Sequence, residues 1–402
     1  MGGLTHPYVK ENTIITYNIQ ALTITLSAMT PSLPKRQSIL SLAVLFVLFL
    51  FPFPALSQEI VYTDAAQFPV YGKATQNTSY RYGRLPASYK GISRPALWEL
   101  GENSAGLFVR FRTDAPSVHV KFTSTPGAGM PHMTDVGDNG VDLYANIEGR
   151  WKFVGSGFTW SRGKRKESMV VGNMEPVMRE YMMYLSLYDG VDSLKIGVPD
   201  GYRLHQPSLG SPSTSHPIVM YGTSILQGGC ASRPGMAHTA IISRQLDREV
   251  INLGFSGNAR LDMEIARLIA EVKDPGAVVL DYVPNSGPEL IRQKAEEFYF
   301  IIRKAHPRVP IIFVEDPIFP HSIVDLKMKE EVASKNAAQK EVFASLKKKG
   351  EKNIYYVPAE GMIGDDGDAT VDGIHLTDLG MMRYVDHIMP TLRKALRKAR
   401  TL

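Results

Sequence analysis

A serine, an aspartate and a histidine in the second half of the sequence could together perform nucleophilic catalysis. Ser224 follows an apolar run at 218–221 and a Gly-Thr bend, whereas Asp372 and His375 lie three residues apart near the C-terminus. A serine hydroxyl attacks a carbonyl only when a base takes its proton, and an aspartate that orients a histidine provides that base. The pattern therefore predicts Ser224 as nucleophile, His375 as base and Asp372 as its partner.

A tetrahedral intermediate also needs hydrogen-bond donors for its oxyanion. Gly257 follows the apolar run 250–253, and Asn285 follows the run 277–282. The backbone N–H groups of Ser224 and Gly257 and the side-chain amide of Asn285 could supply three donors. Each of these residues alone is better explained as a helix cap or a turn, so the prediction depends on their joint order.

The elements that must position these residues form an alternating pattern of strands and helices. Apolar runs typical of strands recur at 218–221, 250–253, 277–282, 309–314 and 354–357, and helical patterns at 237–246, 263–272, 289–304, 327–346 and 377–397. This alternation predicts a five-stranded parallel, doubly wound, flavodoxin-like α/β sheet in three layers. All the candidate residues follow strands, and the carboxyl ends of parallel strands are where such sheets bind ligands.

The preceding part of the chain has a different pattern. Period-two alternation at 107–112, 117–122 and 141–145, with turn residues between the runs, predicts an all-β sandwich. A length of 402 residues also favours two domains. We expect a β-sandwich domain at 58–204, a Pro/Ser-rich linker at 205–216 and the α/β domain at 217–402.

Residues 1–57 have the layout of a signal peptide. Lys35 and Arg36 precede an apolar stretch at 39–51, and small residues before Gln58 resemble a cleavage site. The preceding residues fit neither a signal nor a domain, so we expect translation to begin at Met29. An exported protein, periplasmic or extracellular, is predicted; an uncleaved membrane anchor is the alternative.

Composition excludes some classes of function. The sequence is 44% apolar and 21% charged with a net charge of +5, and acidic and basic residues are interspersed, so no nucleic-acid-binding face is expected. The histidines lack metal-ligand spacing, and the acidic run 365–368 lacks the later glutamate of a calcium loop. We expect no metal and no cofactor. Cys230, the single cysteine of the sequence, is predicted to be a buried small hydrophobe. No oligomeric state is predicted.

The ordered set of motifs in the second half resembles the SGNH (GDSL-like) esterases and acylhydrolases. Their four blocks match Gly222-Thr223-Ser224, Asn252 to Gly257, Asn285, and Asp372-Gly373-Ile374-His375. The resemblance covers 217–402 and implies the fold and residue roles given above. Two blocks differ from the usual pattern, with Gly-Thr-Ser-Ile for Gly-Asp-Ser-Leu and Val-Pro-Asn-Ser for Gly-x-Asn-Asp. These differences concern substrate preference, since the serine and asparagine are kept.

The first half carries a second resemblance. Asn139 to Tyr144 reads Asn-Gly-Val-Asp-Leu-Tyr, which is similar to the Gly-x-Asp-Leu-Tyr signature of a β-sandwich domain that precedes such hydrolases in bacteria. Together with Gln227 to Cys230, this resemblance implies removal of acetyl groups from glycans. Asp142 and Tyr144 are expected to be strand-pairing positions, in a domain that could still cover one wall of the cleft.

The sequence thus predicts an exported serine esterase whose substrate is an acylated carbohydrate. Asp281, Tyr282 and Glu315, at two further strand ends, are predicted to hydrogen-bond sugar hydroxyls. Two alternatives remain: an acylhydrolase for longer acyl chains or thioesters, and a non-catalytic glycan-binding protein on a hydrolase scaffold.

Overall fold

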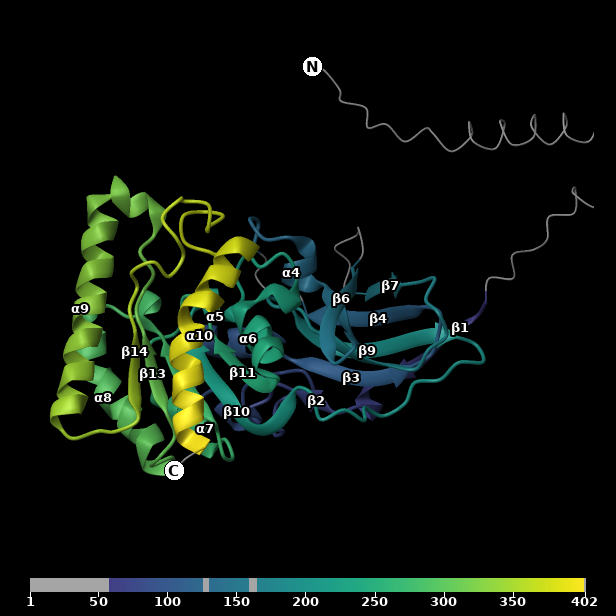
Figure 1. Cartoon of the computed structure of the whole chain (residues 1–402), viewed down its shortest axis with the longest axis horizontal. Coiled ribbons are helices and arrows are strands. Elements are labelled where there is room, and N and C mark those ends of the chain that lie inside the picture. Colours follow the sequence, from purple (N-terminus) through teal and green to yellow (C-terminus); the bar gives the residue numbers. More distant parts are fainter. Residues whose placement is uncertain (1–57, 126–129, 159–164, 401–402) are drawn as a thin grey trace, which may run out of the picture. The chain divides into compact units, whose positions relative to one another are not determined.

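The computed structural model describes residues 58–125, 130–158 and 165–400 (Figure 1). The predicted signal peptide at 1–57 lies outside the described residues. Residues Glu59–Leu402 form one compact unit. In the described part of the chain, no helix combines the length and the apolar character needed to cross a membrane.

The second half of the chain forms a five-stranded, fully parallel sheet. Its spatial order is β11-β10-β12-β13-β14. The strands are β10 (Ser213–Gly222), β11 (Arg248–Gly254), β12 (Ala277–Asp281), β13 (Ile311–Val314) and β14 (Ile354–Val357). This arrangement confirms the predicted doubly wound topology. The chain leaves β10 for one neighbour, β11, and then crosses to the other, β12, so the switch point lies beside β10.

Helices cover both faces of this sheet. They are α5 (Ser224–Gln227), α6 (His238–Leu246), α7 (Met263–Glu271), α8 (Pro288–Ala305), α9 (Leu326–Lys348) and α10 (Asp378–Arg400), with short 3-10 turns η3 (Pro234–Met236), η4 (Val283–Asn285) and η5 (Pro320–Ile323). Alternate residues of β10 enter opposite cores: Ile218 and Met220 pack with α6 and α10, whereas Val219 and Tyr221 pack with α7 and α8. Because side chains alternate across a strand, this division defines three layers.

The first half forms two antiparallel sheets, which confirms the predicted all-β region. One has the order β1-β9-β4-β7 and the other β2-β3-β8-β5-β6. The strands are β1 (Ile60–Asp64), β2 (Val70–Tyr71), β3 (Phe108–Thr113), β4 (Val118–Thr125), β5 (Val141–Ile147), β6 (Arg150–Gly157), β7 (Arg165–Val171), β8 (Arg179–Tyr184) and β9 (Gly190–Pro199). A shared apolar core joins the sheets, with residues such as Phe111 and Phe122 from opposite sides.

Short helical elements interrupt the strands of this region. They are η1 (Ala65–Gln67), η2 (Ala87–Tyr89), α3 (Pro95–Gly101) and α4 (Asp135–Asn139). None of these exceeds seven residues among the described residues. They are too short to show a helical hydrophobic period, which is why the sequence pattern did not reveal them.

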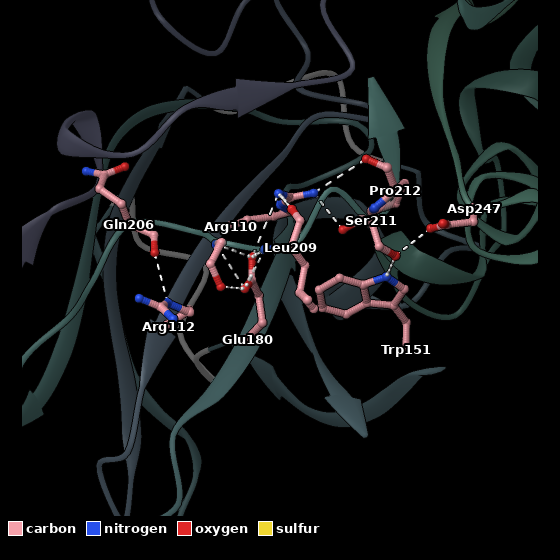
Figure 2. Close-up of polar contacts among 10 residues, drawn as sticks. Arg110, Arg112, Trp151, Glu180, Gln206, Leu209, Ser211, Pro212 and Asp247 are labelled. Atoms are coloured by element: carbon pink, nitrogen blue, oxygen red, sulfur yellow. Dashed lines mark hydrogen bonds and ion pairs between the residues drawn. The ribbon is translucent and has the colours of Figure 1, made fainter. Parts of the chain in front are cut away.

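The segment expected to be a linker is bound along the second antiparallel sheet (Figure 2). Arg110 of β3 donates to the backbone carbonyls of Leu209 and Ser211, and the Glu180 carboxylate of β8 accepts from the N–H of Leu209. Both charged side chains are almost fully buried and lie 3.8 Å apart. Since these hydrogen bonds satisfy the backbone of an irregular segment, the crossover is held in place. Its last four residues, from Ser213, belong to β10.

Arg84 connects the two halves of the compact unit. Its buried guanidinium donates to the carbonyls of Leu100 and Asn103 in the first half, and to those of Asn252 and Gly254 at the end of β11. Burial lowers the pKa of Arg84 to about 10, so it stays charged at neutral pH. A buried charge is tolerated only when its hydrogen bonds are satisfied, and here carbonyls from both halves satisfy it.

Candidate active site

The register of the parallel sheet brings the predicted site segments to one edge. Gly222, the last residue of β10, pairs with Gly254 on one side and with Asp281 on the other. Ser224, Gly257 and Asn285 follow these three positions by two, three and four residues. The three segments therefore leave neighbouring strands at the same level of the sheet.

Ser224 is the first residue of the short helix α5, directly after β10. The end of β11 passes very close to this helix: a Cβ at Gly254 would lie 2.2 Å from the Gln227 nitrogen. Only glycine permits this approach, because any side chain would collide with backbone. Gly254, which lies within the second sequence block, is therefore a glycine for reasons of packing.

The structure brings Ser224, His375 and Asp372 together. His375 Nε2 lies 2.9 Å from Ser224 Oγ, and His375 Nδ1 lies 2.7 Å from Asp372 Oδ2. Partial burial acts to raise the pKa of Asp372, but hydrogen bonds from the His375 side chain and from backbone N–H groups lower it to about 2. An ionised carboxylate requires the proton on Nδ1, which leaves the Nε2 lone pair for the serine hydroxyl.

Local turn chemistry presents this Asp–His pair. Asp372 Oδ1 accepts from the N–H groups of Ile374 and His375, at 3.0 and 2.7 Å. The N–H of Val371 donates to the His375 carbonyl at 2.8 Å, which closes the loop. An aspartate that bonds the backbone two and three residues later orders such a turn, so one side chain fixes both the loop and the imidazole.

The other two predicted oxyanion donors lie at the same sheet edge. Gly257 is exposed and has φ +67°, a conformation that favours glycine. The amide oxygen of Asn285 accepts from the N–H of Ala259 at 3.3 Å. That contact sets the orientation of the amide, and its Nδ2 has no hydrogen-bond partner among the described residues. Such a group can donate to a ligand.

Gln227 is a residue whose role the sequence did not indicate. It is fully buried, and its Nε2 donates to Asn103 Oδ1 and to the Leu187 carbonyl, both at 3.0 Å. Its Oε1 accepts from the N–H of Ser256 at 3.0 Å. Gln227 thereby links the helix of Ser224, the loop of Gly257 and the β-sandwich region.

The first half of the chain contributes directly to the surroundings of the triad. The Tyr188 hydroxyl lies 3.4 Å from the carbonyl oxygen of Ser224. His132 Nε2 lies 3.4 Å from Asp372 Oδ2, and its ring centroid is 5.2 Å from that of His375. Residues of this domain therefore lie beside the site, as expected for a domain that covers one of its walls.

Asp142 and Tyr144 pair in β5 as predicted, but their side chains have a further role. The fully buried Asp142 carboxylate accepts from Arg233 Nη1 at 3.0 Å and from the Gly235 N–H at 2.9 Å, and Tyr144 Oη also accepts from Arg233. The signature thus anchors the segment that follows α5. A buried aspartate requires a donor partner, but its identity, 91 residues away, was not evident from the sequence.

Asp281, Tyr282 and Glu315 are buried and hydrogen-bonded within the fold, an arrangement that does not favour their predicted contact with sugar hydroxyls. Their exposed fractions are 2%, 0% and 3%. Asp281 accepts from the Tyr384 hydroxyl at 2.8 Å, and the Tyr282 hydroxyl donates to a glutamine of α9. Glu315 accepts from a tyrosine hydroxyl and a backbone N–H of the 356–359 segment. These polar residues at strand ends were predicted as ligand contacts, but residues of other segments satisfy them inside the fold.

Cys230 is buried, with 6% of its surface exposed, and is a free thiol. Burial, together with the nearby Asp372 charge, raises the pKa of the thiol to about 12. The uncharged thiol is a poor nucleophile at neutral pH, in accordance with the predicted apolar role.

Family models match both halves of the chain. Residues 215–393 match the GDSL-like lipase/acylhydrolase family, and residues 60–204 match the N-terminal region of SGNH-hydrolase-type esterases. A comparison with curated proteins finds no match.

Similarity to solved structures extends over both halves of the chain. A protein described as a GDSL-like lipase from Bacteroides ovatus is 34% identical, with a TM-score of 0.80 over 84% of this chain and 98% of the other. A salicylyl-acyltransferase from a tetracycline biosynthetic pathway is 17% identical, with a TM-score of 0.66 over 84% and 98%. A family two carbohydrate esterase from Cellvibrio japonicus is 12% identical, with a TM-score of 0.54 over 85% and 99%. The latter two likenesses concern the fold alone.

These matches, with the parallel sheet and the serine at its edge, define a hydrolase that has a doubly wound parallel sheet preceded by an all-β region. The chain belongs to the GDSL-like lipase/acylhydrolase family of SGNH-type hydrolases.

The burial of Asp281 predicts a specific pH dependence of stability. Burial raises the pKa of Asp281 well above its ordinary value of about 3.9, although the Tyr384 hydrogen bond opposes the shift. The folded state then binds more protons than the unfolded state above pH about 4, so rising pH reduces stability. Asp281→Asn removes the ionisable group that causes this loss of stability. The free energy of unfolding of the variant, relative to the wild type, should increase from pH 4.5 to pH 7 in urea titrations.

The exposed Asp365→Asn change is the matched control. Its free energy of unfolding should vary with pH as that of the wild type does. Ester hydrolysis by Asp281→Asn should also stay near the wild-type level, because this side chain faces the core. Parallel pH profiles for wild type and Asp281→Asn would contradict the assignment.

Proposed function

We propose that this protein is an exported serine esterase that removes acetyl or other short acyl groups from carbohydrates through an acyl-enzyme on Ser224. The observation that carries the proposal is the continuous hydrogen-bond chain from Ser224 Oγ through His375 to Asp372, at 2.9 and 2.7 Å. Family membership supports hydrolysis of a carboxylic ester. Export rests on the signal-like layout of residues 1–57.

The geometry supports a two-step reaction. Ser224 Oγ attacks the ester carbonyl while its proton passes to His375 Nε2, and Asp372 stabilises the imidazolium that forms. His375 then gives that proton to the departing sugar oxygen, so the acyl group stays on Ser224. A water, deprotonated by His375, attacks the acyl-enzyme; the carboxylic acid leaves and the proton returns to Ser224 Oγ.

The negative oxygen of each tetrahedral intermediate needs donors that are already in place. The N–H groups of Ser224 and Gly257 and the Nδ2 group of Asn285 are proposed for this role. Gln227 holds the Gly257 loop to α5, and Ala259 holds the Asn285 amide. Because these donors are fixed by other contacts, they need no reorganisation as charge develops.

The carbohydrate substrate is supported by resemblance in fold. Structures with TM-scores above 0.5 include family two carbohydrate esterases, one of them from Clostridium thermocellum in complex with cellohexaose. The Gly-x-Asp-Leu-Tyr region, which packs beside the triad, adds the two-domain organisation associated with glycan deacetylation. We therefore propose an acylated glycan as the substrate.

A pocket near the catalytic loop favours the alternative of a longer acyl chain. It has a volume of about 550 Å³, and apolar residues such as Ile318, Phe319 and Met362 line it together with Glu360 and Asp365. His321 of η5 lies against Gly373, where a Cβ would be 2.9 Å from the imidazole Nδ1. Since apolar pockets bind acyl chains in proportion to buried area, this pocket supports a lipid-type acylhydrolase as the second candidate.

Ser224→Ala should abolish ester hydrolysis and leave the fold intact. Loss of a nucleophile lowers kcat by roughly 10⁴-fold or more in serine hydrolases, since no acyl-enzyme can form. The measurement is hydrolysis of an aryl acetate with circular dichroism as a folding check. Ser215→Ala, an exposed position on the preceding strand β10, is the matched control. Full activity of Ser224→Ala would remove the proposed mechanism.

Asn285→Ala should lower kcat by roughly 10²- to 10³-fold with a small change in KM, because a donor to the oxyanion acts mainly in the transition state. Steady-state kinetics on an acetyl ester provide the test. Asn285→Asp keeps an acceptor for the Ala259 N–H but loses the Nδ2 donor. If Asn285→Asp retains wild-type kcat, Asn285 has a structural role only.

A series of acetyl, butyryl and octanoyl esters should show highest kcat/KM for acetyl, and acetylated polysaccharides should release acetate. Preference for octanoyl esters, reduced by Ile318→Ser at the apolar pocket, would establish the second candidate instead. Binding of a glycan without turnover of any ester would identify a non-catalytic binding protein.

A further inference from the structure

Three potential metal ligands meet beside the triad. His132, Cys230 and His375 each offer a ligand atom, and these atoms all lie within 4.8 Å of one another. His132 lies in the β-sandwich region, Cys230 follows α5, and His375 precedes α10. Imidazole nitrogen and thiolate sulfur are the donors that zinc-class ions prefer.

We propose that His132, Cys230 and His375 form an inhibitory site for a zinc-class divalent cation. This inference rests on the proposed function, because inhibition requires His375 to be the catalytic base. The cation would be a reversible regulator, not a participant in ester hydrolysis.

The cluster fits such an ion after a small contraction. Tetrahedral zinc, with bonds of about 2.0–2.1 Å to nitrogen and about 2.3 Å to sulfur, separates its ligands by roughly 3.3–3.7 Å. Side-chain rotations that move the ligand atoms by about 1 Å would bring the three atoms to this spacing. His132 can supply such movement because it lies outside helices and strands, and its Nε2 has no hydrogen-bond partner among the described residues.

The surroundings suit a bound cation. The carboxylate of Asp372 lies 3.4 Å from His132 Nε2 and adds negative charge beside the cluster. The side chains of His132 and His375 are 30% and 18% exposed, so the cluster lies near the surface, with His132 Nε2 and Cys230 buried beneath it. On binding, the Cys230 thiol releases its proton to solvent and binds as thiolate, which the metal favours. Three protein ligands leave a fourth position for water.

Either ring nitrogen of His375 gives the same functional result. A metal at Nε2 takes the lone pair that must accept the Ser224 proton, and a metal at Nδ1 replaces the proton that is donated to Asp372. Both arrangements interrupt the triad. The sequence did not predict the site because its ligands come from separate segments; His132 and Cys230 are 98 positions apart.

The test combines activity with spectroscopy on the purified chain. Zn²⁺ should inhibit hydrolysis of an aryl acetate, and EDTA should restore the activity. In Cys230→Ser, the Zn²⁺ concentration for half-inhibition should rise at least about tenfold, with metal-free kcat within about twofold of the wild type. Co²⁺ titration of the wild type should produce a near-ultraviolet thiolate-to-cobalt band that Cys230→Ser and Cys230→Ala both lack.

His132→Asn should weaken Co²⁺ binding, measured by the same band. Equal Zn²⁺ inhibition of wild type and Cys230→Ser, or absence of the band at saturating Co²⁺, would overturn the proposal. The catalytic proposal is tested separately: Ser224→Ala should bind Co²⁺ as the wild type does, since Ser224 is no ligand. An active Ser224→Ala protein with an intact band would refute the esterase mechanism and leave the metal site standing.

Discussion

The site depends on the buried side-chain amide of Gln227, whose donors and acceptor all need hydrogen-bond partners. It donates to Asn103 and Leu187 of the first half and accepts from Ser256 of the loop after β11. A buried amide that loses a partner costs about 1–3 kcal/mol for each unsatisfied group, so the helix that begins at Ser224 is held in one position relative to both regions. Preorganisation of the proposed nucleophile therefore has its origin outside the triad.

Much of the α/β fold could be predicted because its causes are local. Strands buried on both faces are continuous apolar runs, and most of the helices between them have an amphipathic period. The alternation of strands and helices, and the parallel direction of the strands, therefore follow from general rules. The same logic located Ser224, Gly257 and Asn285, because residues after parallel strands converge at one edge. The Asp372–His375 pair could be predicted for a local reason as well, because two residues three positions apart on a turn lie close together in any fold.

The remaining features could not be predicted because they depend on contacts between distant segments. The partners of Gln227 and Arg233 are Asn103 and Asp142 of the β-sandwich region, and nothing in the sequence connects these distant residues. Conversely, Asp281 and Glu315 lie at strand ends, as ligand contacts do, but tyrosine hydroxyls satisfy them inside the core. Whether a polar side chain faces a cleft or a buried partner is decided by packing, which a single sequence does not encode locally.

Side-chain contacts cross the boundary between the two halves of the chain at three places near the site. Arg84 bonds carbonyls at the end of β11, Asp142 anchors the segment after α5, and His132 lies against Asp372. These contacts reach, in turn, the strand that leads to Gly257, the segment that follows the helix of Ser224, and the aspartate that pairs with His375. The β-sandwich region is therefore part of the proposed catalytic architecture. Its removal would expose the buried Gln227 amide and leave Arg233 without its carboxylate partner. The α/β half is therefore incomplete as a site without the region in front of it.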